Sequence, residues 1–112
     1  MSTPETTALD LVTFVYASGG LSNVATVLTE LAARMEPGAL CDEAQRRPAP
    51  VVQRLGHLLD LVERPRLAEP LLRSLMGRRF RPVLLDPSQP RGTIEASAPW
   101  RVIANVPVEV DL

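Results

Sequence analysis

The 112-residue chain contains no lysine, one cysteine and one histidine. Without lysine, the chain cannot form a Schiff base or a Walker-type phosphate-binding loop. The single cysteine, Cys41, excludes an intramolecular disulfide and an all-cysteine metal site, and the single histidine, His57, excludes the multi-histidine sites of zinc enzymes. Because no catalytic motif stands elsewhere in the chain either, we expect a non-enzymatic protein with no catalytic, cofactor-binding or metal-ligating residues.

Arginine and proline are the residues present in excess, with 12 arginines and 11 prolines. The composition is otherwise that of a globular protein, because hydrophobic residues make up 46% of the chain and charged residues 22%. A chain of this length can bury a core without disulfides or metals. We therefore predict one domain that spans residues 1–112.

The net charge of −1 is unevenly distributed along the chain. Residues 1–45 carry one arginine against six acidic residues, whereas residues 46–81 carry nine arginines against three. The acidic balance of the whole chain argues against nucleic-acid binding over its entire surface. The arginines of the middle segment could form a local basic patch. The simpler interpretation is that they lie on a solvated helix face.

The N-terminal sequence does not have the pattern of a secretory signal, because Glu5 and Asp10 stand where such a signal carries cations. Residues 11–29 are uncharged and approach the length of a membrane span, but they contain a Gly-Gly pair and several hydroxyl side chains. Two amphipathic helices joined by a turn explain this segment better. We expect a cytoplasmic protein with no membrane partner.

Apolar spacing and proline positions predict five helices in residues 3–77. The first begins at a Ser2–Glu5 capping box, or at Thr3 with Pro4 in the first position, and Gly19 and Gly20 end it. Ser22 or Asn23 caps the second. The predicted inner face of the first helix consists of Ala8, Leu9, Val12, Val15 and Tyr16. The predicted buried residues of the second helix are Val24, Val27, Leu28, Leu31 and Met35.

The third predicted helix starts at Pro37 and stops before Pro48 and Pro50. The fourth has the clearest apolar face, which consists of Val51, Leu55, Leu58, Leu59 and Val62. Its polar residues lie mostly on the other faces and are Gln53, Arg54, His57 and Asp60. The fifth carries Pro70, which requires either a helix start close to it or a kink. This helix ends at Gly77, and its predicted inward residues are Leu67, Leu71, Leu72, Leu75 and Met76.

Two strands follow, within a β element at residues 80–107. Residues 82–86 form a short buried strand that ends in an Asp86–Pro87 turn, and residues 100–106 form a second strand with alternating faces that begins at Trp100. The intervening loop is too long for a tight hairpin. The predicted fold class is α+β, mainly helical, with a small C-terminal β element of two strands.

Few residues are candidates for a functional site. Cys41 lies beside two carboxylates that raise a thiol pKa, so we interpret it as a packing residue, and His57 as a partly buried structural histidine. The GRRFRP sequence at 77–82 is a weak phosphate-binding signal, because arginines at a helix end also favour its dipole. A possible partner or nucleic-acid surface comprises Arg54, Arg73, Arg78, Arg79 and Arg81.

Four segments, in this order and spacing, resemble the C-terminal domain of AbiEi-type antitoxins. They are STPETTALDLV at the N-terminus, VVQRLGHLLDLV at 51–62, RPVLLDP at 81–87 and WRVIANVPVEVDL at the C-terminus. No single segment is specific, but their order is. The family's usual RLGYLL has His57 in the tyrosine position here, which keeps an amphipathic ring.

The resemblance implies the antitoxin of an AbiE abortive-infection system, a type IV toxin–antitoxin system used in phage defence. Such antitoxins oppose a nucleotidyltransferase-like toxin and are not known as enzymes. An N-terminal winged helix typically binds operator DNA and represses transcription of the operon. Family members usually carry this winged helix and further strands before the segment that matches STPE, whereas here Met1 stands directly before it. We therefore expect the C-terminal domain alone, truncated or stand-alone, so operator binding by a winged helix does not carry over from the resemblance.

Loss of the family's neighbouring strands would leave an apolar sheet edge, and such an edge pairs readily with another chain. We expect a homo-oligomer through this edge, or pairing with a separately encoded partner. Two alternatives remain open: a transcription-regulatory or oligomerisation module that uses the arginine-rich patch, and a decayed remnant that folds only as an oligomer.

Overall fold

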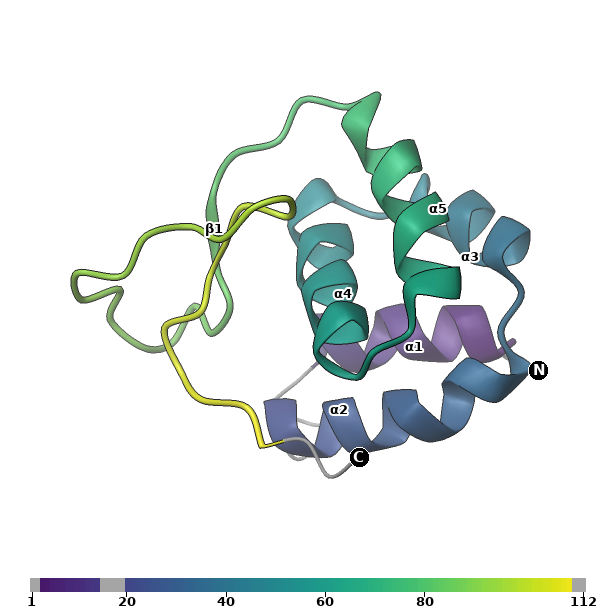
Figure 1. The fold of residues 1–112 in the computed structure, drawn as a ribbon, viewed down its shortest axis with the longest axis horizontal. Helices are drawn as coiled ribbons and strands as arrows, with labels where there is room; N and C mark the ends of the chain where they lie inside the picture. The colour runs from purple at the N-terminus through teal and green to yellow at the C-terminus, as the bar shows by residue number, and fades with distance from the viewer. Residues whose placement is uncertain (1–2, 15–19, 110–112) are drawn as a thin grey trace.

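The computed structural model describes residues 3–14 and 20–109 and has the predicted α+β architecture (Figure 1). A body of helices is followed by two short strands packed against one side of it. In chain order the elements are α1 (Pro4–Thr13), α2 (Leu21–Leu31), a 3-10 turn η1 (Ala32–Arg34), α3 (Pro37–Ala44), α4 (Ala49–Leu61), α5 (Pro65–Met76), β1 (Val83–Leu84) and β2 (Val102–Ile103). No helix among the described residues is both long and apolar enough to cross a membrane.

Proline determines where several helices start. Pro4, Pro37 and Pro65 each occupy the first position of a helix, where a missing amide hydrogen costs nothing. Thr3 caps α1, since its Oγ1 accepts a hydrogen bond of 3.1 Å from the Thr6 amide. Of the two predicted caps for α1, the Thr3 alternative is therefore confirmed.

The connection between α1 and α2 differs from the prediction. The first helix ends at Thr13 rather than at the glycine pair, and the predicted inward residues Val15 and Tyr16 lie outside the described residues. Gly20, with a φ of 93°, is the N-cap of α2, so the prediction that Ser22 or Asn23 caps this helix is wrong. Ser22 instead accepts a 3.1 Å hydrogen bond from the Glu109 amide and ties the C-terminal segment to α2.

The helical core forms around α4, which packs against α1, α2 and α5. The predicted apolar face of α4 is buried in full, and so are most of the predicted inward residues of the other helices. Met35 is buried as predicted, but it follows η1 instead of lying on α2. Val27 and Leu72 are only partly buried, and Met76 is 62% exposed at the end of α5.

Pro70 lies inside α5, five residues after the helix begins. The predicted alternative of a helix start close to Pro70 is therefore wrong. The Arg66 carbonyl cannot receive an amide hydrogen from Pro70. As predicted, α5 ends with Gly77 as its C-cap.

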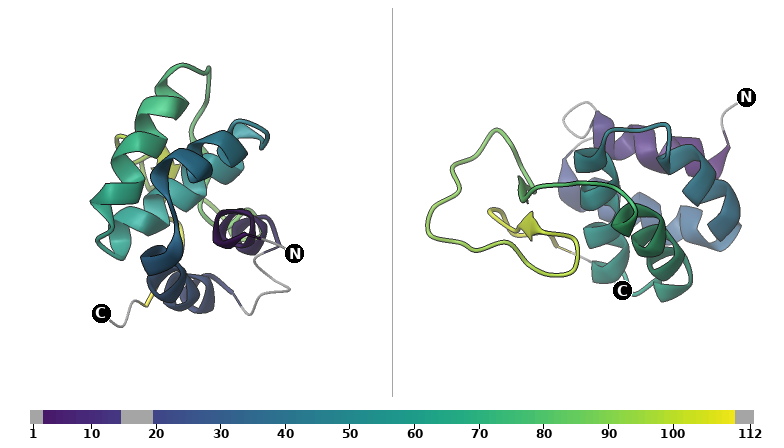
Figure 2. Two further views of the ribbon diagram at one scale, coloured as in Figure 1. Left: turned by 90° about the vertical axis from the view of Figure 1, so that its right-hand side faces the viewer. Right: turned by 90° about the horizontal axis from the view of Figure 1, so that it is seen from above.

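The two strands are much shorter than predicted and pair in parallel, with Val83 opposite Val102 and Leu84 opposite Ile103. The predicted alternation along 100–106 is wrong, because Val102 and Ile103 are both buried. Arg101, whose φ is 57°, precedes them and breaks the extended geometry that alternation needs. The loop between the strands extends away from the helical body (Figure 2).

The outward-facing carbonyls of this sheet are already engaged. The Leu84 oxygen accepts a 2.9 Å hydrogen bond from Nε of Arg54 on α4, and the Val102 oxygen accepts one of 2.8 Å from the Ser97 amide. An edge whose acceptors have partners offers less to another strand. Association through the sheet edge stays a prediction, and the occupied acceptors weaken the argument for it.

Trp100 attaches the β element to α4. Its side chain is 2% exposed, and its ring lies directly against the backbone of Gly56, so that a Cβ at that position would overlap the ring. Its indole nitrogen donates a 2.6 Å hydrogen bond to Oδ2 of Asp60, one helical turn further along. Trp100 is thus a core anchor, as predicted, and glycine is required at position 56.

We predict that Gly56→Ala lowers the free energy of unfolding by about 1–3 kcal/mol, because the added methyl group overlaps the Trp100 ring. Urea unfolding followed by circular dichroism measures this change. Gly38→Ala in α3 is the matched control, since a Cβ there meets nothing within 4 Å. Equal stability of the two variants would contradict the role assigned to Gly56.

Candidate functional site

The five arginines proposed as a surface do not form one exposed group. Two of them hold the fold together: Arg54 donates to the Leu84 carbonyl, and Arg78 donates to the carbonyls of Arg47 at 2.9 Å and Ala44 at 3.4 Å. These bonds fix the β element on α4 and the end of α5 on α3. The structure therefore gives Arg54 and Arg78 internal partners.

The other three arginines, Arg73, Arg79 and Arg81, are exposed at the end of α5 and in the linker that follows. Phe80, between two of them, is half-buried, and the guanidinium of Arg101 lies 4.9 Å from the centre of its ring. Arg101 also donates to the Phe80 carbonyl at 3.0 Å. One face of the ring is thus covered by a cation, which leaves less of it for a stacked base.

Gln53 has a structural role that the sequence did not predict, since it was expected only to lie away from the apolar face of α4. It is fully buried, and its amide nitrogen donates to the carbonyls of Arg81 at 2.8 Å and Trp100 at 2.9 Å. Gln53, Gly56 and Asp60 recur at helical spacing, which gives α4 a second face for the β element. In the sequence, the signal for this second face was a stripe of polar residues and glycine on the side of the helix opposite its apolar face.

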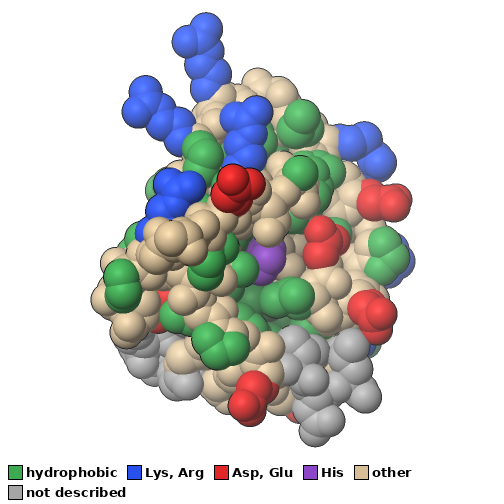
Figure 3. Space-filling view, turned by 60° about the vertical axis from the view of Figure 1, so that its left-hand side comes forward, with side chains coloured by type: hydrophobic (Ala, Val, Ile, Leu, Met, Phe, Trp, Pro, Cys, Tyr) green, Lys and Arg blue, Asp and Glu red, His purple; other side chains and the backbone are tan. Residues whose placement is uncertain are grey.

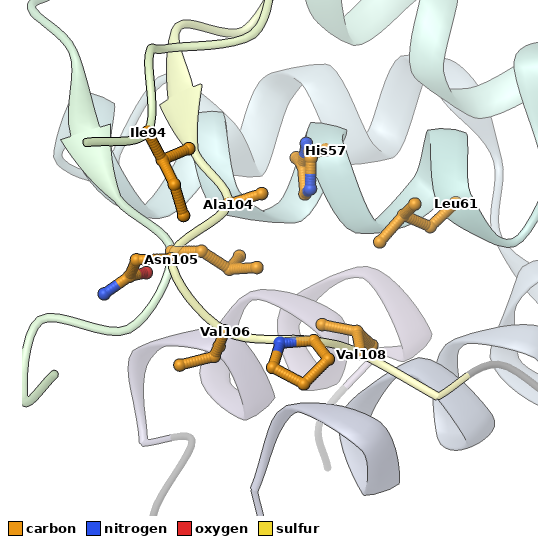
Figure 4. A pocket seen from close by; sticks show the side chains of 9 residues that line it. His57, Leu61, Ile94, Ala104, Asn105, Val106 and Val108 are labelled. Atoms are coloured by element: carbon orange, nitrogen blue, oxygen red, sulfur yellow. The ribbon is translucent and has the colours of Figure 1, made fainter. Parts of the chain in front are cut away.

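Beside this contact the β element and α4 enclose an open pocket of about 480 Å³ (Figure 4). His57 and Leu61 of α4 form one wall, and Ile94 of the long loop and the chain after β2 form the other. The lining consists of His57, Leu61, Leu85, Ile94, Ala104, Asn105, Val106, Pro107 and Val108. Apart from one imidazole and one amide, these side chains are apolar, so the pocket suits an apolar group.

Burial lowers the pKa of His57 below its ordinary value, and nearby Asp60 partly opposes this effect. The imidazole is therefore neutral at neutral pH. Burial also raises the pKa of the Cys41 thiol, with Asp42 adding to the effect and Arg73 opposing it. Cys41 thus remains protonated at neutral pH, which makes it a weak nucleophile. Both interpretations from the sequence agree with these environments.

No group of three or more His, Cys, Asp or Glu side chains within 3–14 and 20–109 is arranged to hold a metal ion. The polar groups near the pocket are instead tied to the backbone. Asn105, for example, donates to the Asp86 carbonyl at 2.8 Å, and its Oδ1 accepts from the Asp86 amide at 3.0 Å. This exchange closes the turn after β1.

Comparison with known families gives a match to the AbiEi antitoxin C-terminal domain over residues 1–61. The matched segment is more than half of the chain and covers α1 to α4. The chain belongs to this family. No curated protein and no solved structure compared with the chain matches it.

Membership in the AbiEi family associates the chain with the antitoxin side of abortive-infection systems, which in general implies a toxin as partner. Such antitoxins are generally non-enzymatic regulators. The matched segment ends on α4, so it includes Gln53, Gly56 and Asp60, whereas their partner Trp100 lies beyond it.

His57 gives the AbiEi-family domain a predicted pH dependence. Because burial lowers its pKa below 6.5, the unfolded chain binds a proton at pH values where the folded chain does not. The free energy of unfolding should therefore decrease as the pH falls through about 6.5 and stop changing below the lowered pKa. Carboxylates add their own dependence at lower pH, so a variant is needed for comparison.

His57→Tyr, which replaces the imidazole with a ring that stays neutral over this pH range, should remove this contribution. We expect urea unfolding at about pH 7.5 and about pH 5.5 to show a larger loss of stability in the native chain than in the variant. An identical loss in both proteins would show that His57 does not change its protonation on folding.

Proposed function

We propose that this chain is a non-enzymatic antitoxin domain that opposes a nucleotidyltransferase-like toxin of an AbiE-type system in the cytoplasm. The single observation that carries the proposal is the family match over α1 to α4. The pocket chemistry supports a binding role, because its walls are mostly apolar and its histidine is neutral at neutral pH. The antitoxin acts through its surface, either on the toxin itself or on the process that the toxin attacks.

Growth during co-expression with the toxin encoded beside it tests the proposal. We expect cells that express the toxin alone to stop growing, and cells that also express this chain to resume growth. An empty vector is the negative control, and Trp100 fluorescence in purified protein verifies that the chain is folded. Continued arrest in the presence of the folded chain would contradict the proposal.

A second candidate function is transcriptional regulation through local nucleic-acid binding. The observation that favours it is the exposure of Arg73, Arg79 and Arg81 on adjoining parts of the fold, since arginine forks bind phosphate well. Arg54 and Arg78 stabilise the fold beneath such a surface through their bonds to backbone carbonyls. The partly covered Phe80 ring favours phosphate contacts over base stacking.

Binding of operator DNA by this surface should weaken steeply as salt increases, with a slope set by the number of phosphates neutralised. Arg79→Gln with Arg81→Gln should reduce that slope by about two, measured by fluorescence anisotropy across a salt series. Arg34→Gln, an exposed arginine of η1, is the control and should change neither the affinity nor the slope. Absent binding, or an unchanged slope in the double variant, would exclude this candidate.

A further inference from the structure

The pocket is bordered by exposed apolar and acidic side chains. Leu61 is 38% exposed and Ile94 is 40% exposed, and both contribute to the lining. Three exposed carboxylates directly adjoin lining residues in the sequence: Asp60 beside Leu61, Glu95 beside Ile94 and Glu109 beside Val108. Figure 3 shows the histidine at the centre of this face with hydrophobic side chains around it and acidic ones to the right and below. The pocket therefore offers an apolar floor with an acidic rim.

The end of α5 has the complementary character. Met76, at 62%, is the most exposed large hydrophobic side chain within residues 3–14 and 20–109, and the exposed arginines Arg73, Arg79 and Arg81 are its close neighbours in the sequence. In Figure 3 most of the basic side chains on this face gather at the upper left, with an acidic side chain next to them. We name this group, Arg73, Met76, Arg79 and Arg81, the basic end.

Charged residues on both surfaces are available for pairing. Among the described residues, the ion pairs join Arg46 and Arg47 to carboxylates of α1 and α3, and none involves the basic end or the acidic rim. Asp60 accepts the Trp100 indole hydrogen bond through Oδ2, and the residue is exposed. One cation also adjoins the rim, because Arg91 donates to the Ile94 carbonyl at 3.1 Å. The rim still carries three carboxylates to one guanidinium.

From this complementarity we infer that the basic end of one copy of the chain docks in the acidic-rimmed pocket of a second copy. Met76 supplies an unbranched, flexible side chain of the kind that fills irregular apolar pockets. The arginines around it meet the rim carboxylates, and arginine is enriched among residues that dominate binding energy. The occupant of the pocket is thus this same chain.

Such a contact is heterologous, because each copy contributes a different surface. A second copy bound in this way leaves its own pocket free, so association continues to a ring or an open chain. This differs from the predicted pairing through the sheet edge, in which backbone groups of β1 or β2 would meet across the interface. Salt should weaken the docking, since its rim pairs are exposed to solvent.

Light scattering over a concentration series measures the self-association. We expect Met76→Gln and Ile94→Gln each to raise the self-dissociation constant by about tenfold or more. Phe14→Gln is the matched control, because Phe14 is 61% exposed and belongs to neither surface. Unchanged circular dichroism and Trp100 fluorescence would establish that the variants are folded.

Mixing the two variants gives the decisive result. Ile94→Gln keeps an intact basic end and Met76→Gln keeps an intact pocket, so an equimolar mixture should form a one-to-one dimer that does not grow further. Three results would overturn the inference: a native chain that stays monomeric at all concentrations, association that both variants leave unchanged, or a mixture that stays monomeric. The second of these would instead favour the sheet edge.

Discussion

The close approach of Trp100 to the backbone of Gly56 determines how the two parts of this protein fit together. Helix α4 buries its apolar face among the other helices and presents a second face, with Gln53, Gly56 and Asp60, to the β element. Because glycine has no side chain, the indole ring reaches the helix backbone and buries nearly all of its surface. Two strands of two residues each would be unstable as an isolated sheet. Their stability depends on this contact with α4.

The same contact joins segments of the chain that lie far apart in the sequence. The α4 segment 51–62 supplies side chains that bind the backbone of the two later segments, 81–87 and 100–106. The pocket is a consequence, since its walls are His57 and Leu61 on α4 and the chain that Trp100 holds in place. The binding role proposed for this surface therefore depends on α4.

Local signals in the sequence predicted the helices well. Proline at the first helical position, a threonine cap and regular apolar spacing all act within one or two turns, and α3 begins at Pro37 as predicted. The cap of α2 was predicted wrongly because Gly20 adopts a positive φ there, which a hydroxyl side chain does not signal. Met76 was predicted to be inward because the spacing continues to the last residue of α5, whereas the core ends at Leu75.

The β element and the site could be predicted only in part, because they depend on contacts distant in the sequence. Parallel pairing of β1 and β2, and the use of Arg54 and Arg78 as backbone donors, arise from tertiary packing that no local pattern encodes. The partly buried environments of His57 and Cys41 were predictable, since each lies on a short apolar stretch of helix.

We expect α4 to join the helices and the β element into one cooperative unit. Trp100 is the only tryptophan, so its fluorescence reports on the contact with α4, while circular dichroism reports on the helices. Measured together during urea unfolding, the two signals should change in a single transition with one midpoint. A shift of Trp100 fluorescence at lower urea, with the helices still formed, would contradict the claim.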